Sequence, residues 1–426
     1  MIINVPQMPW YGDTELALEF PDSWDVTTCR MNGQDTPKIG DKEIRAAFSN
    51  PIGTARIAEL ARGKKDVVIL FDDLTRPTRT AELVPYVLEE LKEGGIRDEN
   101  IRFISALGAH GVMRLMDYVQ KLGLDVVQKY PVYNHNPYEN CTYLGRTARG
   151  IEVSVNSEFM ACDLKIAVGG LVPHPTAGFG GGGKMILPGV SSIETILANH
   201  GGLTEMSEDK NMKLNAWGNV EDNVMRLDIE EIANMAGLDV SVNAVMNLHR
   251  DTVGVFVGDL VAAHRAGVKL ARNHYATPAP EAAADVVVTN AYAKANEAAI
   301  AVETGRKLLK EEGGDLVVTC NIPEGQICHY LARSFGKTFG GRLYGVRTAM
   351  PERVKRMIVL GPYMDRVGLD WLGPQDQIII INSWTEIIDL LKKSHGNGTK
   401  VSVIPDATIQ YFPDLERGKT EIFPAD

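Results

Sequence analysis

Residues 66–78 read DVVILFDDLTRPT, an apolar run followed at once by a polar loop. A continuous apolar run of this length is typical of a strand that is buried on both faces of a sheet. Similar runs recur at Ile101–Leu107, Leu164–Val168, Val240–Met246, Ala284–Thr289, Leu316–Cys320, Met357–Leu360, Gln377–Ile381 and Val401–Ile404. The segments between them place apolar residues three and four apart, which predicts helices. This alternation predicts an α/β fold with mostly parallel sheets flanked by helices.

The segment ATPAPEAAA, Ala276–Ala284, separates a helical pattern from the next strand. A chain of 426 residues is long enough for two domains. We therefore expect a first domain over residues 1–275 and a second over residues 276–397. The remaining residues, 398–426, contain one more strand, and we expect this tail to pack back on the first domain.

Composition excludes several classes of function. Lys and Arg total 44 against 55 for Asp and Glu, and a net charge of −11 argues against nucleic-acid or membrane partners. The five cysteines form no C-x-x-C, so we expect neither a disulfide framework nor a cysteine-based zinc site. The longest uncharged stretch, Ile166–Gly183, is too rich in glycine for a membrane span, and no signal peptide is visible. We expect a cytoplasmic protein.

The segment Gly169–His200, GGLVPHPTAGFGGGGKMILPGVSSIETILANH, has the composition of a ligand-binding loop. Dense glycine favours left-handed or close-approach backbone, and such loops present successive N–H groups to an anion, usually a phosphate. A surface loop without a ligand is the alternative. The lysine Lys184 and the histidines His174 and His200 around the glycines favour a binding site.

Two general nucleotide motifs match this segment weakly. Gly178-x-Gly180-x-x-Gly183 satisfies the dinucleotide pattern, but the acidic residue expected about 20 residues later is missing. Gly178, Gly183 and Lys184 also fit the beginning of a P-loop, but Met185 stands where Ser or Thr would bind magnesium. A P-loop-like phosphate-binding enzyme remains an alternative.

Two other predicted strands end in polar loops. In Asp72–Thr78, Asp73 is placed to orient Arg76, and Thr75 with Arg76 to hold a phosphate or carboxylate. A helix cap with a surface arginine is the alternative there. After the next strand His110 stands between small residues, as an exposed general base or a solvated loop histidine. These two loops and the loop that contains His174 all place polar side chains after predicted strands, which favours a functional site over the alternatives.

With these residues, the chain resembles the nickel-dependent lactate racemase family of 2-hydroxyacid racemases and epimerases over nearly its whole length. That family uses a nickel-pincer nucleotide, pyridinium-3,5-bisthiocarboxylic acid mononucleotide, which a lysine of the founding member tethers through a thioamide. The resemblance implies an active site in the cleft between the two domains. It rests on DDLTRPT (Asp72–Thr78), ALGAH (Ala106–His110), HPTAGFGGGGKMILPGVSSIETILANH (His174–His200), TNAYAKANEA (Thr289–Ala298) and VSVIPD (Val401–Asp406).

The resemblance implies a role for each candidate residue. Lys184 is implied as the covalent tether, His200 as the protein ligand to nickel, and His110 with His174 as the paired acid and base. One histidine would remove the hydroxyl proton while the C2 hydride moves to the cofactor, and the other would return the proton. The groups implied to hold the phosphate and help orient the substrate are Asp73, Thr75, Arg76, Gly180, Gly181, Gly182 and Gly183. The implied partners are a 2-hydroxyacid and cofactor-synthesis proteins, and a homo-oligomer remains open.

The sequence departs from the lactate-specific pattern near the expected substrate. Gly183 and Met185 stand where the lactate enzyme has Arg and Ser, and Gly111–Met113 replaces an Arg-Pro pair. Glu303 stands where that enzyme has a functional lysine, its pocket tryptophan has no clear counterpart, and His329 is a further pocket candidate. We therefore rank sugar acids and longer neutral 2-hydroxyacids above malate-like diacids. A non-catalytic carrier of cofactor or hydroxyacid is the second alternative, which the two histidines oppose.

Overall fold

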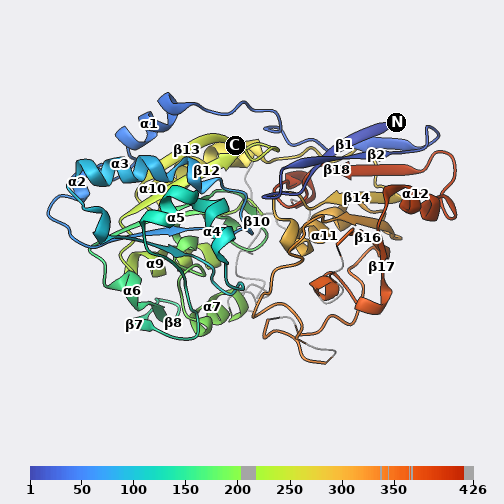
Figure 1. Cartoon of the computed structure of the whole chain (residues 1–426). Helices are drawn as coiled ribbons and strands as arrows, with labels where there is room; N and C mark the ends of the chain where they lie inside the picture. Colours follow the sequence, from blue (N-terminus) through green and yellow to red (C-terminus); the bar gives the residue numbers. More distant parts are fainter. Residues whose placement is uncertain (203–216, 336–337, 344, 364, 366–367, 417–426) are drawn as a thin grey trace. The chain divides into compact units, whose positions relative to one another are not determined.

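The computed structural model describes residues 1–202, 217–335, 338–343, 345–363, 365 and 368–416 (Figure 1). By its internal contacts the chain divides into two units. The central unit is Asp35–Asn273, and the terminal unit combines Met1–Gln34 with the described residues from His274 onward. No helix in the described part of the chain has the length and apolar composition that crossing a bilayer requires.

The central unit is built on a six-stranded sheet in the order β13-β12-β9-β4-β5-β6. All neighbouring strands are parallel except β12 and β13. Every residue of β4 is buried, as the continuous apolar run predicts. The strands are β4 (Val67–Phe71), β5 (Ile101–Ser105), β6 (Val132–Asn134), β9 (Leu164–Gly170), β12 (Val240–Met246) and β13 (Thr252–Gly258).

Helices cover both faces of this sheet. The chain leaves β4 through α3 (Val84–Glu93) toward β5, and it leaves β9 in the opposite direction, reaching β12 through α9 (Val224–Met235). Because such crossovers are right-handed, the two helices lie on opposite faces, above and below the strands in Figure 1. The carboxyl ends of β4 and β9, where the order reverses, are the position at which open α/β sheets bind ligands. We call this position the central switch point.

Smaller elements complete the central unit. Two hairpins pair β7 with β8 and β10 with β11, and a 3₁₀ turn, Gly182–Met185, precedes a π-helical turn, Ala198–Gly202. The remaining elements are α1 (Asp41–Ser49), α2 (Ile57–Leu60), α4 (Leu115–Leu122), α5 (Leu124–Lys129), β7 (Cys141–Arg146), β8 (Glu152–Asn156), α6 (Ser157–Met160), β10 (Pro173–His174), β11 (Gly178–Phe179), α7 (Ile193–Leu197) and α10 (Ala262–His274).

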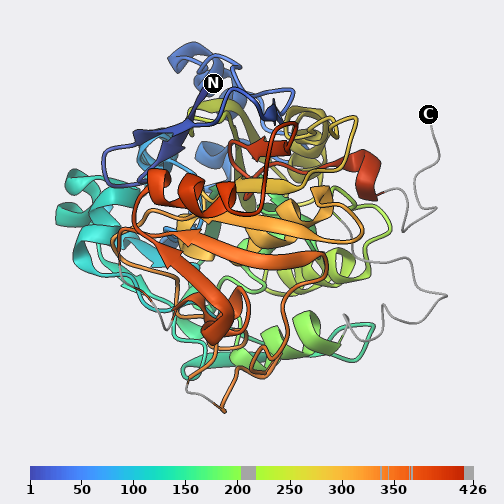
Figure 2. The ribbon, with the colours of Figure 1, turned by 90° about the vertical axis from the view of Figure 1, so that its right-hand side faces the viewer.

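The terminal unit contains a second six-stranded sheet, in the order β17-β16-β15-β14-β18-β3, whose neighbouring strands are all parallel. Helix α12 (Trp384–Lys392) packs on β16 and β17 (Figure 2), and α11 (Ala299–Gly305) packs on β14 and β15. A hairpin of β1 (Ile2–Gln7) and β2 (Thr14–Glu19) and the short helix α13 (Pro413–Glu416) also belong to this unit. The strands are β3 (Asp25–Thr28), β14 (Val286–Asn290), β15 (Gly314–Thr319), β16 (Val354–Leu360), β17 (Ile378–Ile381) and β18 (Lys400–Ile404).

The α/β fold with mostly parallel sheets is confirmed, and the predicted boundary after residue 275 lies beside the observed division after Asn273. The division differs from the predicted domains at both ends of the chain. Strand β3 lies within the first 34 residues, yet it pairs with β18 and belongs to the terminal unit. The described part of the tail 398–426 pairs through β18 with β14 and with β3, so it belongs to the terminal unit. Its apolar side chains need a sheet with both faces covered, and the terminal sheet provides it.

Candidate active site

The loops that follow β4, β5 and β9 meet at the central switch point. The carboxylate of Asp72, directly after β4, accepts a hydrogen bond of 2.9 Å from the amide of Gly170, at the end of β9. The amide of Gly108, after β5, donates to the carbonyl of Gly189 at 2.9 Å. These bonds bring together three loops that the sequence analysis singled out separately.

Asp73 and His110 form a hydrogen-bonded pair in this site. His110 Nδ1 lies 2.7 Å from Asp73 Oδ2, while Asp73 Oδ1 accepts from the Thr75 amide at 2.9 Å and from its hydroxyl at 2.5 Å. Burial would raise the pKa of Asp73, but the charge and hydrogen bond of His110 outweigh burial and hold that pKa well below its usual range. Asp73 therefore remains ionised and orients the imidazole, a contact that the sequence analysis did not anticipate.

Thr75 links this pair to Arg76. Arg76 Nη1 donates to the Thr75 hydroxyl at 2.7 Å and to the Thr75 carbonyl at 3.1 Å. The threonine is fully buried, whereas the arginine is half-buried. Asp73 thus orients Arg76 through Thr75, and a half-buried guanidinium in a fixed position suits a phosphate or carboxylate.

A buried lysine beneath the same loop escaped the sequence analysis. Lys121, on α4, has no exposed surface, and its ammonium donates to Asp72 Oδ1 at 2.5 Å and to the carbonyls of Arg76 and Thr78 at 3.0 and 2.9 Å. Burial lowers the pKa of Lys121, and the carboxylate of Asp72 opposes that effect. The ion pair fixes the backbone from which Asp73 and Arg76 project.

The glycine loop packs tightly against its own unit. A Cβ added to Gly178, whose φ is +74°, would lie 1.9 Å from the Asn219 carbonyl oxygen. The amide of Gly180 donates to the Val172 carbonyl at 2.7 Å, and that of Gly182 to Asn243 Oδ1 at 2.8 Å. An anion cradle formed by the whole Gly180–Gly183 backbone therefore does not fit, because two of its amides already have partners.

Side chains from α9 and α10 hold the carbonyls of this loop. Arg226, fully buried, donates to the carbonyls of Phe179, Ala177 and Gly181, the last two at 3.2 and 3.4 Å. Burial lowers the pKa of Arg226 to about 10. His264 Nε2 lies 2.9 Å from the Gly180 carbonyl, and burial lowers the pKa of His264 well below its ordinary value. The loop that carries Lys184 is thus fixed from beneath.

The structure places His174 beside Lys184, as the resemblance implies for a shared site. His174 Nε2 lies 3.3 Å from Lys184 Nζ, and the lysine side chain is buried although its amine reaches this contact. On the other side of the ring, Nδ1 accepts from the amides of Ala177 and Thr176 at 3.1 and 3.3 Å.

His200, the predicted nickel ligand, lies in the π-helical turn Ala198–Gly202 and is half-buried. Such turns occur frequently at functional sites. Within the described residues, no group of three or more His, Cys, Asp or Glu side chains could hold a metal ion. One protein ligand completed by sulfur donors of a cofactor does not require such a group, so the role of His200 stays a prediction.

The two candidates of the terminal unit have local partners. Glu303 Oε2 accepts from Arg306 Nε at 2.8 Å. His329 Nδ1 accepts from the amides of Leu331 and Ala332 at 3.2 and 3.1 Å, as a turn-forming side chain does. These contacts explain both residues without a ligand.

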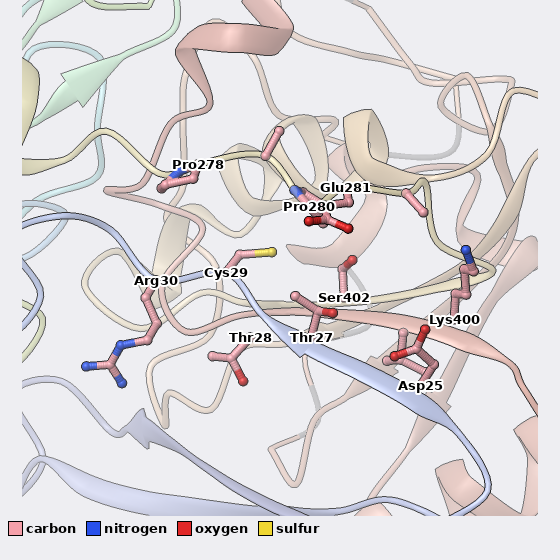
Figure 3. A pocket seen from close by; sticks show the side chains of 13 residues that line it. Asp25, Thr27, Thr28, Cys29, Arg30, Pro278, Pro280, Glu281, Lys400 and Ser402 are labelled. Atoms are coloured by element: carbon pink, nitrogen blue, oxygen red, sulfur yellow. The ribbon is translucent and has the colours of Figure 1, made fainter.

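A cavity of about 580 Å³ in the terminal unit lies apart from every predicted site residue. It opens between the linker Pro278–Ala282 and strands β3 and β18, and Figure 3 shows the Cys29 sulfur pointing into it. Burial raises the pKa of Cys29 to about 12, so this thiol is a poor nucleophile.

Comparison with known proteins agrees with the resemblance. Residues 11–212 match the lactate racemase N-terminal domain family. Over 290 residues the chain is 31% identical to lactate racemase of Thermoanaerobacterium thermosaccharolyticum, covering 66% of this chain and 65% of that protein. Over 293 residues it is 29% identical to lactate racemase of Lactiplantibacillus plantarum, covering 68% of each. The chain is thus similar to lactate racemases over about two thirds of its length. The match spans just under two thirds of the first relative's length.

Two solved structures share the fold. The lactate racemase apoprotein of T. thermosaccharolyticum matches with a TM-score of 0.71 at 23% identity, over 97% of this chain and 100% of that one. A Thermotoga maritima protein matches with a TM-score of 0.59 at 15% identity, over 84% of this chain and 97% of that one. The fold shared with the T. thermosaccharolyticum apoprotein therefore extends over both units.

Proposed function

We propose that the protein is a nickel-dependent racemase or epimerase that inverts the C2 centre of a 2-hydroxyacid. The observation that carries the proposal is that two pairs, Asp73–His110 and His174–Lys184, lie on loops that follow adjoining strands of one switch point. Similarity to lactate racemases supports the reaction class. Inversion needs a proton acceptor and a proton donor, and the two imidazoles supply them.

The Asp73–His110 pair suits the base. Because a carboxylate only accepts hydrogen bonds, a neutral His110 carries its proton on Nδ1, and Nε2 is then the nitrogen that would accept the substrate hydroxyl proton. The nearby negative charge stabilises the imidazolium that forms. Arg76 is placed to hold the carboxylate of the substrate or the phosphate of a cofactor.

The chain's residues fit the nickel-pincer nucleotide that the resemblance implies. Lys184 offers a buried amine as the attachment point, and its contact with His174 favours the neutral amine, because an Nε2–H can donate only to a lone pair. The imidazole of His200 suits Ni(II). When bound, the group supplies an acceptor for the C2 hydride, while the chain handles the hydroxyl proton.

The substrate we favour is a 2-hydroxyacid longer than lactate, such as a sugar acid, because the lysine and tryptophan of the lactate pocket lack counterparts here. Pairing with Arg306 neutralises Glu303, so Glu303 gives no further reason to rank diacids last. We also propose cofactor-synthesis proteins as partners and a cytoplasmic location.

The test is a panel of enantiopure 2-hydroxyacids, given to protein co-produced with cofactor-synthesis proteins and followed by chiral chromatography. Inversion of longer acids supports the proposal, and fast inversion of lactate or malate alone contradicts the substrate ranking. Calorimetry with Mg-ATP addresses the P-loop-like alternative, which Met185 opposes. Binding of hydroxyacids without inversion by loaded protein would favour the carrier.

A further inference from the structure

The two histidines of the site are held at the same ring nitrogen by opposite kinds of partner. His110 Nδ1 faces the carboxylate of Asp73, which can only accept. His174 Nδ1 faces the amides of Thr176 and Ala177, which can only donate, and the Thr176 hydroxyl at 3.3 Å, which is able to donate as well. A neutral imidazole carries one proton, and the partner of one nitrogen decides which nitrogen holds it.

Asn223 holds the turn that supplies these amides. It is fully buried at the start of α9, where its Oδ1 caps the helix by accepting from the Arg226 amide at 2.9 Å. Its Nδ2 donates to the Thr176 carbonyl at 2.8 Å, and that carbonyl shares one peptide unit with the Ala177 N–H. Arg226 Nε binds the next carbonyl, that of Ala177, at 3.2 Å. The turn is therefore anchored with its N–H groups directed at His174.

We infer that His110 and His174 rest as opposite tautomers, protonated at Nδ1 and Nε2 respectively, and that Asn223 is the positioning residue for His174. The catalytic meaning of this inference rests on the proposed function. His110 is then ready to accept a proton at Nε2, whereas His174 already carries one there. To act as the acid, His174 must first gain a second proton at Nδ1 and become an imidazolium, which displaces the amides of Thr176 and Ala177. His174 can accept at Nε2 only after its tautomer changes, which breaks both amide bonds. The two acid–base residues are therefore not interchangeable in the resting protein.

The test is an NMR correlation of ring ¹⁵N and carbon-bound ¹H in the chain without cofactor, labelled at histidine. Signals are assigned by their loss in His110→Gln and His174→Gln. We expect a protonated Nδ1 in His110 and a protonated Nε2 in His174. A protonated Nδ1 in wild-type His174 would overturn the inference. The measurement needs no substrate. If the expected tautomers are observed but the inversion assay fails, the proposed function is refuted while the tautomer assignment holds.

Asn223→Asp separates positioning from folding. The aspartate retains the oxygen that caps α9 but loses the Nδ2 donor to the turn. We expect the His174 ring signals to shift toward the average of the two tautomers, with those of His110 unchanged. The melting temperature should fall, because a buried carboxylate then faces the carbonyls of Thr176 and Asn219, so unchanged His110 signals serve as the check that the site remains folded. Ser192→Ala, which removes the cap of α7 instead, should shift neither histidine. Unchanged His174 signals in Asn223→Asp would remove Asn223 from this role.

Discussion

Each of the two sheets reverses its strand order once, but they differ in what stands at the point of reversal. In the central unit the chain leaves β4 toward β5 and returns on the other side as β9. In the terminal unit it leaves β14 toward β15 and returns on the other side as β18. The carboxyl ends of β14 and β18 are thus a terminal switch point, equivalent to the central one.

The terminal switch point is closed by its own side chains. Asn290, at the end of β14, donates to the carbonyls of Pro6 and Pro405 at 2.8 and 2.7 Å. Asp406, after β18, accepts from the amides of Ala293 and Thr408 at 2.8 and 3.1 Å. The central switch point instead carries two imidazoles and a guanidinium, which are side chains that can move a proton and bind an anion. A point of reversal therefore does not by itself give function, which depends on the side chains at the strand ends.

The largest expected difference between the switch points is the covalent attachment of the cofactor. Lys184→Ala should abolish the cofactor adduct and the nickel-dependent absorbance, because the attachment amine is lost. Lys294→Ala is the matched control, since Lys294 is also a buried lysine and lies beside the terminal switch point. Intact mass after co-production with cofactor-synthesis proteins measures the adduct. A peptide map that places it on another lysine would refute the assignment.

Retention of nickel is the next expected difference. His200→Ala should lose nickel while keeping the adduct, because it removes a ligand and not the tether. His329→Ala, in the terminal unit, is the control and should change neither. Metal analysis together with intact mass measures both, and unchanged nickel in His200→Ala would exclude it from the metal site.

The acid–base pair should follow in size of effect. His110→Ala and His174→Ala are each expected to lower inversion about 10²–10⁴-fold in both directions, since one turnover uses one histidine as base and the other as acid. The double variant should be little worse than either single variant, because the pair acts as a unit. Chiral chromatography from both enantiomers measures this. Loss in one direction alone would contradict the pairing.

Local sequence patterns predicted the central strands of both sheets but could not predict how distant segments pair. All nine predicted apolar runs contain strands, because a strand buried on both faces must be apolar throughout. Strand β3, DVTT, is a partly exposed edge strand and gave no such signal. Its pairing with β18 joins the two ends of the chain, and no local pattern records that.

The sequence predicted site residues whose type and neighbours indicate chemistry, but it did not predict those whose role depends on burial in the folded chain. His110, His174 and Lys184 stand out beside glycines at strand ends. Lys121 lies on an amphipathic helix, where a lysine suggests a solvated face, and its partner Asp72 is distant in sequence. Asn223 likewise appears as an ordinary helix cap until its second bond is seen. Which residue contacts a buried side chain is determined by the tertiary structure, and a local sequence pattern does not contain this information.

The support beneath the central loop should have a smaller effect, on stability. Lys121→Met leaves Asp72 buried without its cation, which we expect to lower the free energy of unfolding by about 3–5 kcal/mol. Lys121→Met combined with Asp72→Asn removes both charges and should recover a large part of that loss. Urea unfolding measures both variants. A single variant as stable as wild type would show that the ion pair does not hold the loop.

The smallest expected difference is in how the two buried carboxylates respond to pH. Burial raises the pKa of Asp406 to about 6, whereas the pKa of Asp73 lies below its usual range. The folded state therefore binds a proton at Asp406 more tightly than the unfolded state does, so this group costs stability as pH rises from about 4 through 6. The cost above pH 6 is about 3 kcal/mol.

The effect of Asp73 on stability has the opposite sign, since Asp73 contributes stability above about pH 4 that is lost as pH falls toward its lowered pKa. Carboxyl ¹³C NMR should show Asp406 titrating near pH 6 with Asp73 still ionised at pH 4, and Asp73→Asn and Asp406→Asn assign the two signals. Ionisation of both groups near pH 4 would contradict both statements, because neither burial at Asp406 nor the contact with His110 at Asp73 would then shift the carboxyl pKa.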